Sequence, residues 1–186
     1  TSVAASEDGG YIVGGYFSSS AIELNNGTIL TNKGNQDGMV IKYDMDGNIE
    51  WTKVIGGSNE DRIQTVAVSS DGGYIVGGYF NSNTIELENG ITLTNKSYLS
   101  DGMIIKYDID GNIEWAKGIG GSNEDRIQTV AVSSDGGYIV GGYFFSITIE
   151  LDNGITLMYK SQKYSNGMII KYSAEGEAEW AKGIES

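Results

Sequence analysis

Residues 55–80 read IGGSNEDRIQTVAVSSDGGYIVGGYF, and residues 119–144 repeat them letter for letter. Residues 3–17, VAASEDGGYIVGGYF, keep a shorter version of the same segment. The tryptophans mark the same period, because Trp51, Trp115 and Trp180 follow one another at intervals of 64 and 65 residues. A fixed period indicates a chain of tandem structural units that pack on their neighbours.

Within the middle copy, short apolar or alternating runs separated by turn residues predict β-strands. Asn89-Gly90 predicts a small hairpin over residues 84–94, since Asn-Gly favours a two-residue hairpin turn. No segment combines a sustained 3.6-residue period with helix caps, so we expect almost no helix. The four main strands are predicted at residues 64–69, 74–80, 102–107 and 113–119.

The run Tyr74–Phe80, YIVGGYF, is nearly all apolar, which suits a strand covered on both faces. Gly77 and Gly78 fit a place where strands or sheets approach closely. Four strands whose faces must be covered by the next copy are typical of propeller blades. We therefore predict an all-β protein, a β-propeller segment of three four-stranded antiparallel blades with a small extra hairpin per blade. The blades are expected at residues 1–55, 56–119 and 120–186.

The repeat also carries a more specific pattern. Trp51-Thr52-Lys53-Val54-Ile55-Gly56-Gly57 is followed by an Asp-Gly-Gly turn, the Tyr-hydrophobic-x-Gly strand, a Gly-Ile-Thr-Leu-Thr hairpin, and KYDIDGNIEW at residues 106–115. This unit resembles the bacterial β-propeller repeat known as the SBBP repeat, over essentially the whole chain. The resemblance implies a propeller in secreted or cell-surface proteins of bacteria. It does not imply one ligand or one reaction.

The number of copies raises a question of closure. Propellers close with about four to eight blades, so three leave two apolar flanks. Two explanations stay open at this stage: a longer protein with further copies, or identical chains that complete a ring. The shortened first copy and the altered end of the last one favour the longer protein. The partner expected at the flanks is therefore a further repeat or another copy of the chain.

The amino-acid composition argues against several classes of function. The net charge is −13, from 25 acidic and 12 basic residues, which disfavours binding to nucleic acid and to anionic membranes. The chain has no Cys and no His, which excludes disulfides and thiolate catalysis and removes the commonest general base. No apolar run is long enough for a membrane helix, so no membrane insertion is expected.

Two repeated polar segments lie between the predicted blades and hold the two arginines of the chain. They could form a polar binding site on one face of the propeller. The alternative is an Arg–carboxylate pair that fixes the spacing of the blades, a role for which the planar guanidinium is well suited. The candidate residues are Asn59, Glu60, Asp61 and Arg62, with Asn123, Glu124, Asp125 and Arg126 in the next copy.

A second motif resembles the start of an EF-hand calcium loop. Asp44 and Asp46 in the first copy, with Asp108 and Asp110 in the second, are weak metal candidates. Calcium needs about six to eight oxygen ligands. The third copy keeps the turn but lacks both aspartates, so an Asp-Gly hairpin turn explains the motif better. We expect no cofactor, with calcium as the one open possibility.

The tryptophans could form a carbohydrate surface, but each sits among apolar residues, and packing of the blades explains them better. The loops at residues 34–36, 97–100 and 161–165 differ in length between copies, as surface loops do. Tyr98, Lys163 and Tyr164 in these loops are therefore additional binding candidates.

Every carboxylate of interest recurs as part of the repeat, and an active site normally breaks such symmetry. The sequence thus favours a non-catalytic, secreted or cell-surface interaction module that binds a protein or a glycan through loops on one face. The first alternative is a structural protomer that assembles through its end blades into a ring or fibre. The second is a glycan-active enzyme that uses paired carboxylates.

Overall fold

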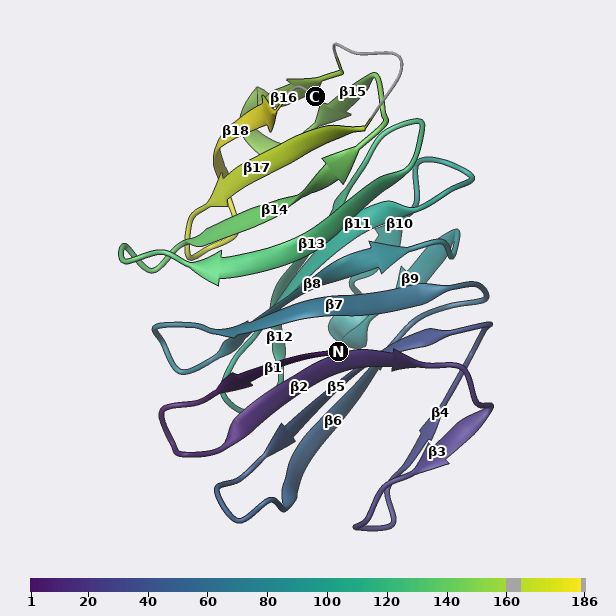
Figure 1. Ribbon diagram of the computed structural model, residues 1–186, viewed down its shortest axis with the longest axis vertical. Helices are drawn as coiled ribbons and strands as arrows, with labels where there is room; N and C mark the ends of the chain where they lie inside the picture. Colours follow the sequence, from purple (N-terminus) through teal and green to yellow (C-terminus); the bar gives the residue numbers. More distant parts are fainter. Residues whose placement is uncertain (160–164, 185–186) are drawn as a thin grey trace.

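The computed structural model describes residues 1–159 and 165–184 and is an all-β, propeller-like segment of three blades. Figure 1 shows three twisted sheets stacked in chain order along the long axis. Blade 1 holds β1 (Ser2–Ala5), β2 (Tyr11–Phe17), β5 (Asp37–Tyr43) and β6 (Ile49–Ile55). Blade 2 holds β7 (Asp61–Val68), β8 (Tyr74–Phe80), β11 (Asp101–Tyr107) and β12 (Ile113–Ile119). Blade 3 holds β13 (Asp125–Val132), β14 (Tyr138–Phe144), β17 (Asn166–Tyr172) and β18 (Ala178–Ile184).

Each sheet is an antiparallel meander in which neighbours in sequence are neighbours in space. The predicted fold class is therefore confirmed. The first strand of blades 2 and 3 begins three residues earlier than the sequence pattern predicts. Asp61, Arg62 and Ile63 continue to pair with β8 beyond a bulge at Gln64, which interrupts the alternation of side chains that marks a strand.

The predicted small hairpins are also present, each inserted between the second and third strands of its blade (Figure 1). In the hairpin of blade 2, Asn89 and Gly90 have φ values of 60° and 76°. Both lie in the left-handed region that Asn and Gly tolerate best, which is why this pair closes the turn. The hairpin strands are β3 (Ala21–Glu23) with β4 (Ile29–Thr31), β9 (Thr84–Glu86) with β10 (Thr92–Thr94), and β15 (Thr148–Glu150) with β16 (Thr156–Met158).

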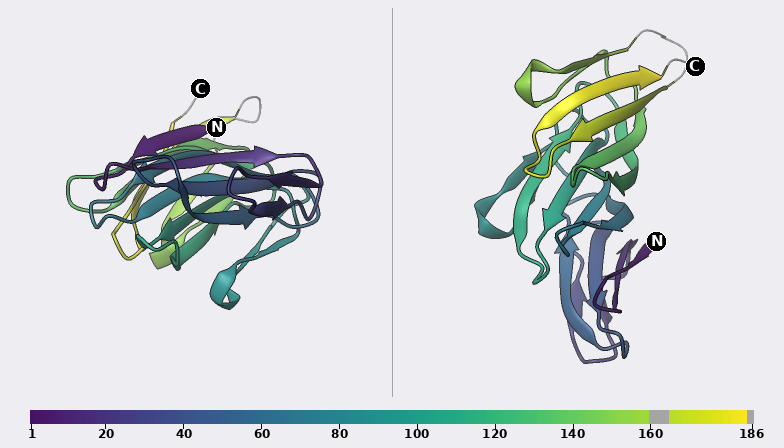
Figure 2. Two further views of the ribbon diagram at one scale, coloured as in Figure 1. Left: turned by 90° about the horizontal axis from the view of Figure 1, so that it is seen from below. Right: turned by 90° about the vertical axis from the view of Figure 1, so that its left-hand side faces the viewer.

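The core lies between the blades rather than within one. One apolar cluster joins Ile12 and Val40 of blade 1 to Ile63 and Val66 of blade 2, and a second joins blade 2 to blade 3 in the same manner. As a result every residue of β8 and of β11 is buried, whereas β2 and β14 are covered incompletely. The stacked arrangement is visible from the side in Figure 2. The described part of the chain contains no helix long and apolar enough to cross a membrane.

Trp51 and Trp115 connect consecutive blades. The Trp51 ring lies 5.6 Å from the Tyr74 ring of blade 2, and its Nε1–H donates to the Ile109 carbonyl at 3.3 Å. It covers Gly111, whose φ is +81° and where an added Cβ would stand 2.8 Å from the indole. Trp115 repeats these contacts on blade 3. The packing role of these two tryptophans is confirmed.

A lysine in each buried third strand was not anticipated by the sequence pattern. Lys106 is fully buried, and its Nζ donates to Glu114 at 2.7 Å and to the Tyr107 carbonyl at 3.0 Å. It also forms an ion pair with Asp71. Burial alone would lower the Lys106 pKa, but the bonds to Glu114 and Asp71 outweigh it and raise the pKa. The charged lysine thus ties the first turn of the blade to its last strand.

The Trp–Gly contact predicts the effect of a small substitution. Gly111→Ala places a Cβ against the Trp51 ring, so it should destabilise the protein by about 1–3 kcal/mol more than the strain of a positive φ alone. Gly27→Ala is the matched control, because Gly27 has a φ of +82° and no atom within 4 Å. Urea unfolding of both variants measures the difference, and equal losses of stability would contradict the contact.

Candidate functional site

The connections 56–60 and 120–124 meet the bases of the hairpins at one edge of the stack, which we call the hairpin edge. The antiparallel register produces this, since Asp61 at the start of β7 pairs with Phe80 at the end of β8. Phe80 in turn pairs with Asp101 at the start of β11. The predicted polar segments lie at this edge, as do the variable loops 34–36 and 97–100.

Arg62 joins blade 2 to blade 1 at the hairpin edge. Its guanidinium lies 4.1 Å from the centre of the Tyr16 ring, and its Nε–H donates to Gln36 Oε1 at 2.7 Å. Glu60 pairs with the same Nε at 3.3 Å. A cation over an aromatic face with a second, hydrogen-bonded contact holds the guanidinium in one orientation.

Arg126 repeats the arrangement at the next junction. Its guanidinium lies 3.9 Å from the centre of the Tyr79 ring, and its Nε–H donates to Ser100 Oγ at 3.0 Å. Glu124 pairs with it at 3.1 Å. The carboxylate that pairs with each arginine therefore comes from the same polar segment as the arginine. The contacts between blades are made instead by a tyrosine ring and by a side chain of a variable loop. This differs from the Arg–carboxylate pair between blades that the sequence suggested.

Tyr79 joins the two junctions into one network. Its ring lies under Arg126, while its hydroxyl donates to Glu60 Oε1 at 2.7 Å. Burial raises the Tyr79 pKa, and the Glu60 carboxylate raises it further, so the phenol remains a donor. Tyr143 donates to Glu124 in the same way at 2.7 Å.

The other predicted residues of these segments are structural. The Asp61 carboxylate is buried and accepts hydrogen bonds from Gly57 N–H, from the backbone of the hairpin base and from the Ser82 hydroxyl. Asp125 makes the equivalent bonds. Asn59 and Asn123 donate their backbone N–H groups to Ser82 and Ser146. The segments thus clamp each connection to its hairpin.

A second buried aspartate lies next to each clamp. Asp37 and Asp101 each accept a backbone N–H through Oδ2, but Oδ1 of each is buried without a hydrogen-bond partner. Burial raises the Asp101 pKa to about 6, and the nearby charge of Asp125 adds to this effect. In blade 3 the equivalent residue is Asn166. These uncompensated carboxylates were missed because an aspartate at the start of a strand looks like a turn residue in the sequence.

The weak metal candidates lie at the opposite edge of the stack. Asp44 Oδ1 accepts the backbone N–H groups of Asp46 and Asn48, and its Oδ2 accepts the Asn48 amide. Asp108 makes the same bonds with Asn112. Within residues 1–159 and 165–184, no group of three or more acidic side chains gathers as it would around a metal ion. Asp110 is exposed in the turn.

The variable loops have different positions relative to the network. Tyr98 is fully exposed and points away from the packed residues. Gln36 and Ser100, from the same loops, instead bind the arginines. The candidates Lys163 and Tyr164 lie outside the described residues.

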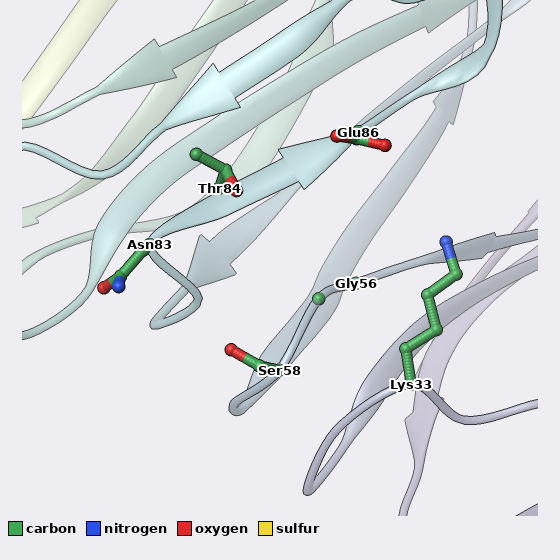
Figure 3. A pocket seen from close by; sticks show the side chains of 7 residues that line it. Lys33, Gly56, Ser58, Asn83, Thr84 and Glu86 are labelled. Carbon is green, nitrogen blue, oxygen red and sulfur yellow. The ribbon is translucent and has the colours of Figure 1, made fainter.

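A pocket of about 360 Å³ opens at the hairpin edge between blades 1 and 2. Lys33 approaches it from blade 1, while Asn83, Thr84 and Glu86 follow the hairpin strand of blade 2 (Figure 3). Its remaining lining is Gly56, Gly57 and Ser58 from the connection between the blades. The pocket therefore presents an ammonium, a carboxylate, an amide, two hydroxyls and backbone groups in one place.

The sequence contained one signal for this pocket. Residues 80–87 read FNSNTIEL where the third copy reads FFSITIEL at residues 144–151, so Asn83 corresponds to the exposed Ile147. A polar residue that replaces an apolar one inside a near-identical repeat breaks the symmetry at this site. Lys33 and Glu86 gave no such signal, because both recur in the other copies.

Comparison with known proteins supports a repeat protein. The chain is 27% identical over 187 residues to the uncharacterized WD repeat-containing protein L264 of Acanthamoeba polyphaga mimivirus, covering 92% of this chain and 13% of that protein. It is 31% identical over 111 residues to the regulatory protein FlaEY of Caulobacter vibrioides, covering 59% and 12%. The chain thus spans about one eighth of the length of these relatives.

No family model matches the chain, so the resemblance to the SBBP repeat stays a prediction. A solved protein of unknown function from Bacteroides caccae aligns with 98% of this chain and 80% of its own, at 9% identity and a TM-score of 0.34. That likeness is too low to support an argument about fold details or function.

The buried Asp101 predicts a pH-dependent effect. Its folded pKa of about 6 exceeds the ordinary value of 3.8, so ionisation destabilises the fold increasingly as pH rises from 4 to 6. Asp101→Asn should be neutral near pH 4 and stabilise the protein by up to about 3 kcal/mol above pH 6. Thermal unfolding across this range measures the effect, with Asp110→Asn as an exposed control. A stabilisation that does not depend on pH would contradict the assignment.

Proposed function

We propose that the chain is a non-catalytic interaction module that binds a hydroxyl-rich ligand, a glycan, in the pocket between blades 1 and 2. The observation that carries this proposal is the pocket lining, where polar residues from two blades border a volume of about 360 Å³. A small-ligand site typically occupies a concave space of about 300–1,000 Å³ with a few well-placed polar groups.

The chemistry of the lining favours a neutral polar ligand. Lys33 and Glu86 supply one positive and one negative charge, so the pocket does not select strongly for an ion. Asn83 offers both a donor and an acceptor, and the hydroxyls of Thr84 and Ser58 can do either. Sugar hydroxyls match such a set because each can donate one hydrogen bond and accept others.

The scaffold around the pocket is suited to hold these groups still. Gly57 has no room for a side chain, since an added Cβ would stand 2.6 Å from the Thr84 carbonyl and 2.9 Å from Ser82. Directly beneath, Asp61 fixes both the connection and the hairpin base. Binding groups carried by such a clamp lose little freedom when a ligand arrives.

Burial of the paired carboxylates supports the non-catalytic assignment over a glycan-active enzyme. A glycosidase needs two carboxyl groups that flank the substrate. Two acidic pairs of the hairpin edge, Asp37 with Asp61 and Asp101 with Asp125, are buried almost completely. Burial raises the pKa of Asp37, Asp101 and Asp125, and the charges of Asp61 and Asp125 raise the pKa of Asp37 and Asp101 further.

The resemblance to the SBBP repeat supports a secreted or cell-surface location in a bacterium, and one of the two relatives is bacterial. The net charge of −13 favours a soluble glycan or protein surface over nucleic acid as the partner class. We expect no metal ion in the interaction, and calcium-independent binding is part of the proposal.

The natural variation between copies provides the test. Asn83→Ile gives the pocket the side chain that the third copy already carries, so the fold should tolerate it. It removes an amide from the lining, and binding on an immobilised glycan array should weaken by about tenfold or more. Ile147→Asn makes the reciprocal change outside the pocket and should leave binding unchanged.

Three results would count against the proposal. The first is an array without any bound glycan, and the second is equal binding by Asn83→Ile and the wild type. The third is loss of binding after addition of a calcium chelator. A screen of immobilised peptides in the same format distinguishes a protein ligand from a glycan.

A further inference from the structure

The two outer faces of the stack are complementary halves of the junction that already occurs twice inside the chain. We call the outer face of blade 1 the leading flank, formed by residues of β1, β2, β5 and the turn 44–48. The outer face of blade 3, formed by residues of β13, β14 and β18, is the trailing flank. The repeat allows each flank residue to be compared with its buried counterpart.

The trailing flank carries the projecting half of the tryptophan contact. Trp180 corresponds to Trp51 and Trp115, which pack on two tyrosines of the following blade. Among the described residues Trp180 has no aromatic neighbour, and 40% of its surface is exposed. Ile184 beside it is 58% exposed, whereas its counterparts Ile55 and Ile119 are buried.

The leading flank carries the receiving half. Tyr11 and Tyr43 correspond to the tyrosines that contact Trp51, and their rings stack on each other at 5.4 Å. Tyr11 is 37% exposed, although its counterpart Tyr74 is fully buried. Gly47 has the same φ of +82° as Gly176, the glycine beneath Trp115. The Met45 carbonyl occupies the position of the Ile109 carbonyl that accepts the Trp51 N–H.

A second contact repeats beside the first. Val66 of blade 2 packs on Gly14 of blade 1, and its backbone N–H donates to the Ser2 hydroxyl at 3.2 Å. Val130 packs on Gly77 and donates to the Thr65 hydroxyl at 3.3 Å.

On the flanks, Val3 holds the position of these valines and is 67% exposed. Gly141 and the exposed Thr129 hold the receiving positions on the trailing flank. The two flanks therefore match at two separate contacts, an aromatic one and a backbone one.

We propose that the trailing flank of one chain binds the leading flank of a second copy, with Trp180 seated on Tyr11, Tyr43 and Gly47. The chosen occupant is a second copy because the chain itself displays both halves of one established interface. Such a head-to-tail contact is heterologous, so it produces a ring if the rotation closes and a filament if it does not. This surface is separate from the proposed glycan pocket.

We expect the association of two chains to be reversible and to depend on protein concentration, because it must overcome the repulsion between two chains of net charge −13.

Sedimentation velocity of the 186-residue chain over a range of concentrations tests the proposal. The wild type should shift from one chain to dimers or larger species, and Trp180→Ala should raise the dissociation constant by about tenfold or more. Tyr98→Ala removes an exposed aromatic outside both flanks and should not change association. Higher salt should favour association, because it screens the repulsion between two chains of net charge −13.

A mixing experiment identifies the pairing of flanks. Tyr11→Glu introduces a charge into the leading flank, so Trp180→Ala and Tyr11→Glu should each stay monomeric alone at a concentration at which the wild type associates. Their mixture retains one intact trailing flank and one intact leading flank, and it should form dimers but nothing larger.

Three outcomes would overturn the proposal: a wild type that stays monomeric at every concentration, unchanged association of Trp180→Ala, or a mixture that remains monomeric. Circular dichroism of both variants confirms that they retain the β fold. If the wild type is monomeric yet binds a separately produced chain of further repeats, the occupant of the flanks is another blade and not a second copy.

Discussion

The structure depends on one constraint: the apolar face of each blade must be buried against the next blade. A four-stranded sheet made of YIVGGYF and GMIIKY runs is apolar on both faces, and it cannot hide both faces by itself. The middle blade meets this condition fully, since β8 and β11 are buried along their whole length. The Trp51–Gly111 and Trp115–Gly176 contacts fix how far one sheet is turned against the next, because a bulky ring can sit only where a glycine leaves space.

The polar network at the hairpin edge follows from the same stacking. Once the blades lie face to face, the beginning of the first strand of each blade lies close to the preceding blade. Arg126 can then reach the ring of Tyr79, while the hydroxyl of Tyr79 binds Glu60. Most of the conspicuous charged residues of the repeat are thus engaged in holding blades and hairpins together. The groups available to a ligand are less conspicuous ones, such as Asn83 and Lys33, that line the space between two blades.

Repetition gives the chain two different kinds of surface. At the hairpin edge, small departures from the repeat, such as Asn83 opposite Ile147, make one junction chemically distinct from the next. On the flanks, by contrast, the copies agree in sequence, and this agreement produces two surfaces that match each other. Specific ligand recognition is therefore expected where the copies differ, and association where they agree.

The sequence by itself determined the repeat, the strands, the hairpins and the blade order, because all of these depend on local patterns of apolar and turn residues. It also indicated that Gly77 and Trp115 serve packing. Only the tertiary structure decided which residues meet: that Arg62 lies on Tyr16, that Lys106 is buried with Glu114, and that Asp101 is buried beside Asp125. Such contacts join residues far apart in the chain, and local sequence patterns carry no information about the relative placement of two sheets. The pocket and the match of the two flanks depend on that placement, so only the tertiary structure reveals them.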